Sequence, residues 1–444
     1  MSATESRELV STPANRIDLF SFKGPSMRAF HMAWSAFLLT FFGWFAVAPL
    51  MPVIREEMQL TKEQIGNCIV ASVVATIFVR LVVGAICDRV GPRRTYSWLL
   101  MLGSLPVMLI GLAHDYTSFL LFRLAIGGVG ASFVVTQYHS SVMFAPNVVG
   151  RAAAITAGWG NLGGGIAQIA MPLLMASLVS LGVSQAWGWR LAMVVPGALM
   201  FVWGLLYSRV TQDYPAGNAE DGVTPLKKYG ASHENAFLLA CRDYRVWALF
   251  LTYASCFGVE LTFHNLAALY YKDTFSLSLT AAGVVAGSYG LMNIFARGLG
   301  GYASDRVAMR FGIRGRVLLL GLLLVGEGVG LVLFSQMRTL PAAIAAMVLF
   351  ALFTQMASGG TYAVVPFLNR RALGSVAGIV GAGGNVGAVI AGLLFREAQA
   401  PMSTTFAWLG LTVIACASLT LFVRFSDDTE ERERALLDAA SLNT

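Results

Sequence analysis

The sequence predicts an all-α membrane protein with twelve transmembrane helices, arranged as two six-helix halves related by pseudo-twofold symmetry. Three observations predict this class. Charged residues make up only 12% of the 444 residues, whereas soluble domains carry about 25%. About twelve apolar runs approach or exceed the roughly 17 to 25 residues that a helix needs to cross a bilayer, among them 33–54, 97–113 and 317–334. Motifs of the first half also recur in the second.

The internal repeat rests on two pairs of motifs. The pattern R-x3-G-x3-D-R occupies 80–89 and recurs at 297–306. The glycine-rich runs GWGNLGGG at 158–165 and GAGGNVGA at 381–388 correspond in the same way. Many secondary transporters are built from such repeats and hold their substrate near the bilayer midplane, at the repeat interface. The sequence therefore predicts that the functional site lies between the halves.

Polar segments divide the chain into five predicted parts. They are a cytoplasmic N-terminal segment at 1–30, a six-helix bundle at 31–208, a cytoplasmic linker at 209–242, a second six-helix bundle at 243–424 and a cytoplasmic tail at 425–444. The first part lacks the apolar stretch of a cleavable signal peptide, so helix one is expected to direct insertion.

The net charge of +7 is better explained by membrane topology than by a nucleic-acid partner. The basic residues cluster in short loops between apolar runs, and loops of this kind stay on the cytoplasmic side. We therefore expect a multi-pass protein of the cytoplasmic membrane with both termini inside. The cations assigned to the cytoplasmic side are Arg89, Arg93, Arg94, Lys227, Lys228, Arg306, Arg310, Arg314, Arg316, Arg370 and Arg371.

The sequence offers no pattern for an enzyme or a metal protein. Its five cysteines are far apart, with no CxxC pair and no histidines at metal-ligand spacing. Free thiols are the simplest interpretation. A glycine-rich cofactor motif beside a strand and a placed nucleophile are also missing, so we expect no enzymatic activity and no cofactor.

Several short segments carry a resemblance to a known family. GAICDRVGPRR at 84–94 resembles the cytoplasmic loop motif of the major facilitator superfamily, and Arg123 with Gly127 resembles its fourth-helix motif. AGWGNLGGGIAQ at 157–168 and GAGGNVGAVIAG at 381–392 are similar to the paired nitrate motifs of the nitrate/nitrite porter family. The chain is most similar to the high-affinity branch of that family from plants, algae and cyanobacteria. The resemblance implies the major facilitator fold and a nitrate or nitrite substrate.

Arg80 and Arg297 are the predicted anion-binding residues. Each lies deep in an apolar helix, where a cation costs about 2.5 to 3.5 kcal/mol on insertion scales. The alternative is that each pairs with a buried acid or with helix carbonyls. The only acids near them on their own helices, Asp88 and Asp305, are eight positions on, about 12 Å along the axis. A guanidinium suits a small planar anion, so an anionic substrate is the expected partner. The resemblance places substrate-binding arginines at both positions.

Asn161, Asn385, Gly160 and Gly384 are further candidates for the substrate site. Small residues let membrane helices pack closely, so the glycines alone are weak evidence. A buried amide in hydrocarbon, however, needs hydrogen-bond partners. We expect the asparagines to line the pocket while the glycines bring helix backbones close. The resemblance matches Asn161 to a substrate-contacting asparagine.

Tyr253 and Phe257 lie four residues apart and so share one face of the seventh helix. The resemblance matches both to aromatic positions that sandwich or hydrogen-bond the anion in relatives, although aromatic pairs at this spacing more often serve packing. For Phe45 and Phe133, packing is the better interpretation.

Glu260 is the predicted proton-coupling residue. An inside-negative membrane opposes anion entry by about 2.3 kcal/mol per charge per 100 mV, so uptake needs coupling. Ionisable groups inside a membrane are candidates for that role. The alternative for Glu260 is a structural salt bridge to Arg123 or Arg80. The roles of His139, His264 and Glu327 stay open.

The loop motif predicts a conformational latch. Gly84, Asp88 and Arg89 in the first half, with Asp305 and Arg306 in the second, are expected to hold the cytoplasmic ends together in one transport state. The accompanying motion would be a rocking of the two halves.

The combined prediction is a secondary transporter that imports nitrate, and nitrite as well, by alternating access with protons as the coupling ion. One alternative is a nitrate:nitrite antiporter and another is a membrane nitrate sensor. Some plant relatives need a small single-span partner protein, and the sequence leaves open whether this chain needs one or acts as a monomer.

Overall fold

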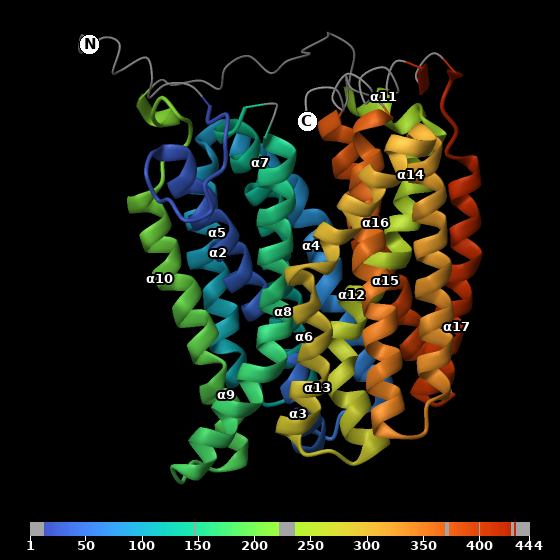
Figure 1. Cartoon of the computed structure of the whole chain (residues 1–444). Helices are drawn as coiled ribbons and strands as arrows, with labels where there is room; N and C mark the ends of the chain where they lie inside the picture. The colour runs from blue at the N-terminus through green and yellow to red at the C-terminus, as the bar shows by residue number, and fades with distance from the viewer. Residues whose placement is uncertain are drawn as a thin grey trace. The chain divides into compact units, whose positions relative to one another are not determined.

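The computed structural model describes residues 13–145, 148–221, 236–368, 373–398, 400–427 and 430–431. Over these residues the chain is almost entirely helical, with only two isolated β-bridges. The α-helices are α2 (Pro25–Phe45), α3 (Met51–Met58), α4 (Lys62–Val90), α5 (Pro92–Leu109), α6 (Tyr116–Gly127), α7 (Ser132–Met143), α8 (Val149–Ser180), α9 (Gln185–Ala192), α10 (Val194–Val210), α11 (Ala236–Arg242), α12 (Tyr244–Phe275), α13 (Leu279–Leu291), α14 (Ala296–Gln336), α15 (Leu340–Val364), α16 (Leu373–Glu397) and α17 (Met402–Ala417) (Figure 1).

Short 3-10 turns connect or end several of these helices. They are η1 (Ala48–Leu50), η2 (Ile110–Leu112), η3 (Gly128–Ala131), η4 (Ala219–Asp221), η5 (Met292–Ile294), η6 (Val365–Phe367) and η8 (Ser418–Phe422). Three of them, η1, η3 and η5, lie between two helices of the same apolar segment.

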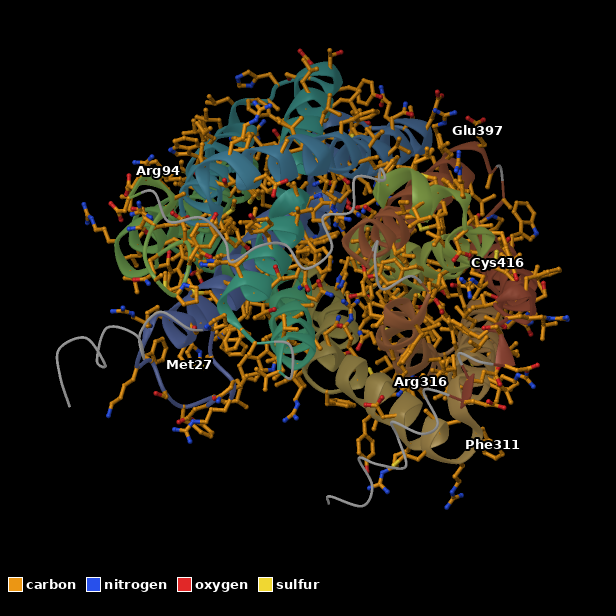
Figure 2. All side chains as sticks on the ribbon, turned by 90° about the horizontal axis from the view of Figure 1, so that it is seen from above. Met27, Arg94, Phe311, Arg316, Glu397 and Cys416 are labelled. Atoms are coloured by element: carbon orange, nitrogen blue, oxygen red, sulfur yellow. The ribbon has the colours of Figure 1, made fainter. Side chains whose placement is uncertain are left out.

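The described residues contain eleven helical segments long and apolar enough to cross a membrane. The longest, Leu279–Gln336, has 58 residues, about three times the length that one crossing needs. It contains Gly312, whose φ of 63° and ψ of −156° break the helix. Phe311 and Arg316 lie on either side of this break (Figure 2). Two crossings in this segment give the twelve transmembrane helices that the sequence predicted.

Local sequence signals explain several helix boundaries. The Thr61 side chain accepts a hydrogen bond from the Gln64 backbone N–H, and the Gln64 side chain accepts one from the Thr61 backbone N–H, a capping box that starts α4. Asp115 and Ser118 form the same arrangement at the start of α6. Gly91 has a φ of 83° between α4 and α5, a conformation that glycine adopts without strain.

The chain forms two compact units. Unit 1 contains Met1–Tyr229 and His264–Leu291, and unit 2 contains Gly230–Phe263 and Met292–Thr444. The boundary falls inside α12, between Phe263 and His264, so this helix contributes residues to both units.

Unit 1 has an aromatic core along α2. Phe37, Phe41, Trp44 and Phe45 are at most 1% exposed and contact one another in sequence along the helix. α8 packs against α2 at Gly163, where an added Cβ would overlap the backbone of α2. Close helix contact at a small residue is how membrane helices gain packing energy.

Unit 2 is organised around α14, which packs against both α15 and α17. Phe263, Phe334, Phe350 and Phe406 form a cluster of edge-on and tilted rings at its centre. The loop cations Lys227, Lys228, Arg370 and Arg371, with much of the linker and of both termini, lie outside the described residues.

Candidate functional site

A buried ion pair joins α14 and α12 in unit 2; we call it and its neighbours the Arg297 cluster. Arg297 Nη2 donates to Glu260 Oε2 at 2.9 Å, and Asn293 Nδ2 donates to the other carboxylate oxygen at 2.9 Å. The Glu260 side chain is fully buried and the Arg297 side chain is 10% exposed. Each oxygen of the buried carboxylate therefore has a donor, one of them cationic.

This pair corrects one step of the sequence argument. The absence of an acid close to Arg297 on its own helix suggested an anionic substrate as the missing partner, yet Glu260 of α12 supplies a carboxylate. Spacing along one helix cannot detect a partner on another helix. The alternative considered for Glu260 was a salt bridge to Arg123 or Arg80. Glu260 does form a salt bridge, but its cationic partner is Arg297.

Arg297 lies where its transmembrane helix is interrupted. α13 ends at Leu291, the 3-10 turn η5 follows, and α14 begins at Ala296. Arg297 is therefore in the first turn of α14, where the helix dipole is positive and favours negative charge. The turn also positions Asn293 to reach Glu260. Sequence reasoning missed Asn293, although a lone amide four residues before Arg297 in an apolar segment was a usable signal.

Aromatic side chains form one wall of this cluster. The Arg297 guanidinium lies 5.5 Å from the centroid of the Phe257 ring. Tyr253 stacks on Phe257 at 5.2 Å with an interplanar angle of 13°, and Tyr362 of α15 meets Tyr253 edge-on. The predicted pair Tyr253 and Phe257 thus lies beside Arg297, and Tyr362 is an aromatic neighbour that helical periodicity could not reveal.

Asn385 and Gly384 belong to the same unit but differ in surroundings. Asn385 is fully buried, and its Nδ2 donates to the Gly381 carbonyl at 3.4 Å. Its Oδ1 is buried and accepts no hydrogen bond from the described residues. Gly384 packs on Phe257, whose ring and Cβ would overlap an added Cβ.

Unit 1 repeats this arrangement around Arg80 of α4. The Arg80 guanidinium lies 5.5 Å from the centroid of the Phe133 ring, and its Nη2 donates to the Gly130 carbonyl at 3.4 Å. Each predicted arginine therefore faces a phenylalanine ring, and the Phe133 ring contacts Arg80 as well as packing against its neighbours.

Asn161 and Gly160 lie on α8 in unit 1. Asn161 is 1% exposed. Gly160 packs on Phe37 of α2, and an added Cβ would overlap that ring and its Cβ. Because Gly384 packs on Phe257 in the same manner, the two repeats share a glycine-on-phenylalanine contact that sets the separation of two helices.

The glycine-on-phenylalanine contact predicts that a larger residue at either glycine lowers the stability of the fold. Gly160→Ala and Gly384→Ala are each expected to destabilise the folded chain by about 1 to 3 kcal/mol through overpacking. Gly378, on the same helix as Gly384, has no atom within 4 Å of an added Cβ, so Gly378→Ala is the matched control. Thermal unfolding in detergent measures the difference, and equal melting temperatures for Gly384→Ala and Gly378→Ala would contradict the close contact.

His139 and His264, whose roles the sequence leaves open, form contacts within unit 1. His139 Nδ1 bonds to the Tyr207 hydroxyl at 2.5 Å and Nε2 bonds to the Gln212 carbonyl at 2.9 Å. The His264 ring lies between those of Phe45 and Tyr289. Both rings are 1% exposed.

Arg123 of α6 is a buried cation held by neutral oxygens. Its Nη2 donates to Asn265 Oδ1 at 2.9 Å and its Nη1 to the Trp44 carbonyl at 3.4 Å. Asn265 is a further polar residue that the sequence reasoning missed.

Glu327 of α14 is fully buried beside Thr354 of α15. The Thr354 hydroxyl already donates to the Phe350 carbonyl at 2.8 Å. Both carboxylate oxygens of Glu327 are buried and accept no hydrogen bond from the described residues.

The loop motif residues lie at helix ends. Asp305 accepts from Arg316 Nη1 at 2.5 Å, and Arg306 donates to the Tyr302 hydroxyl at 2.9 Å. Both contacts are internal to unit 2.

In unit 1, Gly84, Asp88 and Arg89 occupy the last turns of α4. Asp213 accepts from the Arg93 amide at 2.8 Å and fills the space beside Gly91. Burial raises the pKa of Asp213. The sequence reasoning did not identify Asp213 as part of this loop.

Comparison with known proteins places the chain in a family. The Major Facilitator Superfamily profile matches residues 33–392. The chain is 39% identical over 409 residues to "High affinity nitrate transporter 2.5" of Arabidopsis thaliana, covering 91% of this chain and 81% of that protein. It is 36% identical over 424 residues to "Nitrate transporter 2.2" of Chlamydomonas reinhardtii, covering 93% and 82%. It is 31% identical over 475 residues to "Nitrate/nitrite transporter NrtP" of Nostoc punctiforme, covering 91% and 93%.

Among solved structures, a bacterial homologue of the human lysosomal transporter Spinster, in an inward-facing and unoccupied conformation, has a TM-score of 0.66. It is 17% identical and covers 91% of this chain and 96% of that one, which identifies the fold alone. Fold, family profile and relatives agree with the resemblance carried by the loop and glycine motifs. The chain is a multi-pass membrane transporter and not an enzyme; it belongs to the major facilitator superfamily and, within it, to the nitrate/nitrite porter family that these relatives represent.

Proposed function

We propose that this chain imports nitrate, and nitrite as well, across the cytoplasmic membrane by alternating access coupled to protons. The observation that carries the proposal is the buried Arg297–Glu260 pair beside an aromatic wall. It combines a planar cation suited to a small oxyanion with a carboxylate that can take up a proton. The names of the relatives supply the substrate class.

Competition for Arg297 gives a mechanism for coupling. In this mechanism, nitrate and the Glu260 carboxylate compete for binding to the Arg297 guanidinium. When nitrate displaces Glu260, the carboxylate loses its cation in a buried place, and protonation removes the cost of leaving a charge there. Proton and nitrate therefore bind together, and release of one favours release of the other.

Arg80, Asn161 and Asn385 remain proposed substrate contacts. A guanidinium that faces a phenylalanine ring has its apolar side covered, which leaves the in-plane N–H groups as its donors. Nitrate and nitrite carry no hydrogen to donate, so an asparagine amide can contact them only through its N–H donors. Gly160 and Gly384 contribute through helix spacing, since their open sides are filled by Phe37 and Phe257.

The proposed topology places both termini in the cytoplasm. It rests on the arginine-rich loops, which positive-inside bias assigns to that side. In this orientation Asp88, Asp305 and Arg306 lie toward the cytoplasmic side, and we propose that the contacts of Asp305 and Arg306 change during the transport cycle. Nitrate import against an inside-negative potential then uses the inward proton gradient as its energy source.

Proteoliposomes test this function directly. With an imposed inward proton gradient and no internal anion, labelled nitrate is expected to accumulate above its external concentration. With equal pH on both sides and nitrite inside, an exchanger would instead take up nitrate in proportion to the internal nitrite. If the rate of nitrate uptake is independent of the pH gradient and increases with the internal nitrite concentration, the chain is a nitrate:nitrite antiporter and the symport proposal is wrong. Binding without movement of the anion in either assay would favour a sensor.

A further inference from the structure

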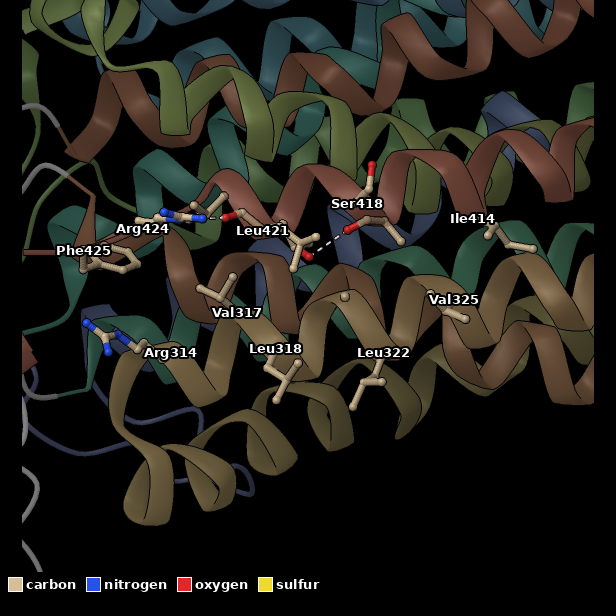
Figure 3. Close-up of a pocket in the computed structure, with 14 residues that line it drawn as sticks. Arg314, Val317, Leu318, Leu322, Val325, Ile414, Ser418, Leu421, Arg424 and Phe425 are labelled. Carbon is tan, nitrogen blue, oxygen red and sulfur yellow. Dashed lines mark hydrogen bonds between the residues drawn. The ribbon is translucent and has the colours of Figure 1, made fainter.

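An open groove of about 710 Å³ lies on the surface of unit 2, away from the Arg297 cluster. One wall is the part of α14 that follows Gly312, with Val317, Leu318 and Leu322. The other wall is formed by the end of α17 and the turn η8, with Ser418 and Leu421 (Figure 3). We call it the α14–α17 groove.

Most of the groove is apolar and faces outward. Leu318 is 60% exposed, Leu322 is 59% exposed and Leu421 is 65% exposed. These helices cross the membrane, so the exposed side chains face lipid. Gly321 forms the floor, where an added Cβ would lie 2.7 Å from Thr420 Oγ1. The shape is a channel along the helices that suits a hydrocarbon chain.

One end of the groove is cationic. Arg314 and Arg424 lie at the same end, next to Phe425 (Figure 3). Arg424 Nε donates to the Leu421 carbonyl at 3.3 Å, and no carboxylate pairs with this side chain within the described residues. Its remaining N–H groups are suited to an anionic oxygen.

Arg314, at the same end of the groove, forms ion pairs with two carboxylates. Its Nε donates to Glu430 at 2.6 Å and its Nη2 to Asp427 at 3.1 Å. The side chains of Arg314 and Asp427 are 68% and 87% exposed, so this pair is solvent-screened and contributes little stability. The Glu430 side chain is 20% exposed. A phosphate group can displace Asp427 at low cost because its carboxylate can return to water.

We propose that the α14–α17 groove binds an anionic phospholipid. Its phosphate contacts Arg424 and Arg314, and one acyl chain lies along Leu318, Leu322 and Leu421. Charge complementarity at one end and an apolar channel at the other select this ligand over a zwitterionic lipid. The proposed topology places the cationic end on the cytoplasmic side, and basic residues near that surface each attract anionic lipid.

Native mass spectrometry of the full chain with dioleoyl phosphatidylglycerol or dioleoyl phosphatidylcholine tests the proposal. The wild-type chain is expected to bind phosphatidylglycerol more tightly. Arg424→Gln should weaken that binding about fivefold, the equivalent of about 1 kcal/mol, and the double variant Arg314→Gln/Arg424→Gln about 25-fold. Ser418→Phe, which fills the channel and leaves both arginines in place, should weaken binding of both lipids.

Arg209→Gln is the matched control, since Arg209 is an exposed arginine at the end of α10 in unit 1 and does not line the groove. It removes the same charge and should leave lipid binding unchanged. Equal binding of the two lipids by the wild-type chain, or equal losses for Arg209→Gln and Arg424→Gln, would overturn the proposal. Full competition by glycerol phosphate with no effect of Ser418→Phe would mean a site for a soluble phosphate instead. None of these outcomes depends on nitrate transport.

Discussion

Nitrate binding is expected to fall at least about 30-fold when Arg297 is replaced by lysine. The guanidinium is planar and can meet a planar oxyanion with two parallel N–H groups, while an ammonium is a compact point charge. The ammonium would stay on Glu260, whose carboxylate already lies 2.9 Å from Nη2. Loss of a buried, hydrogen-bonded charge contact costs about 2 to 5 kcal/mol, which gives this factor or more.

Isothermal titration or labelled-nitrate binding to the purified variant measures the effect. Arg80→Lys should show a loss of the same order, because Arg80 lies over Phe133 as Arg297 lies over Phe257. Arg209→Lys, at an exposed position, should bind normally. Lysine preserves the charge opposite Glu260, so Arg297→Lys should melt near the wild-type temperature. Binding near wild-type strength in a well-folded Arg297→Lys would remove this arginine from the proposed site.

Glu260→Gln is expected to abolish nitrate accumulation driven by a proton gradient while exchange between equal nitrate pools survives. The amide is nearly the same size as the carboxyl but carries no charge and cannot take up a proton. Arg297 would then lack its competing anion at every pH, so nitrate could bind without a proton. Asn293, which donates to Glu260 at 2.9 Å, can donate to the amide oxygen as well.

The pH dependence of binding gives an independent readout. The proposed uptake of a proton by Glu260, with release of Arg297, predicts that the nitrate affinity of the wild-type chain rises as pH falls. In Glu260→Gln the affinity should be flat across the same range and at least as high as that of the wild-type chain at low pH. Wild-type accumulation by Glu260→Gln would show that another group carries the proton. A steep pH dependence in that variant would lead to the same conclusion.

Helix-level features of this chain were readable from its sequence. Charged residues are rare, apolar runs have membrane length, and arginines repeat with the glycine motifs. These features depend on periodicity and composition along one helix, and they predicted the crossings, the family and the positions of Arg80 and Arg297. The proximity of Tyr253 and Phe257 to Arg297 also followed from one helix face and the resemblance.

Contacts between helices were not readable in this way. Glu260 and Arg297 are 37 residues apart, and nothing in their local spacing indicates that they pair. The break at η5, which sets Arg297 in a first helical turn, occurs in a segment without proline. Gly160 and Gly384 looked like substrate contacts or general packing, while their specific partners, Phe37 and Phe257, depend on how helices approach.

The sequence by itself determined the class of the molecule, because a bilayer imposes length, apolarity and loop charge on every crossing helix. It also supplied the residue types that a small anion needs. Tertiary structure alone decided which charges are neutralised and by what, since ion pairing depends on distances between separate helices. The Arg297–Glu260 contact is the outcome of that packing, and it turned two candidates for separate roles into one proposed site for an anion and a proton.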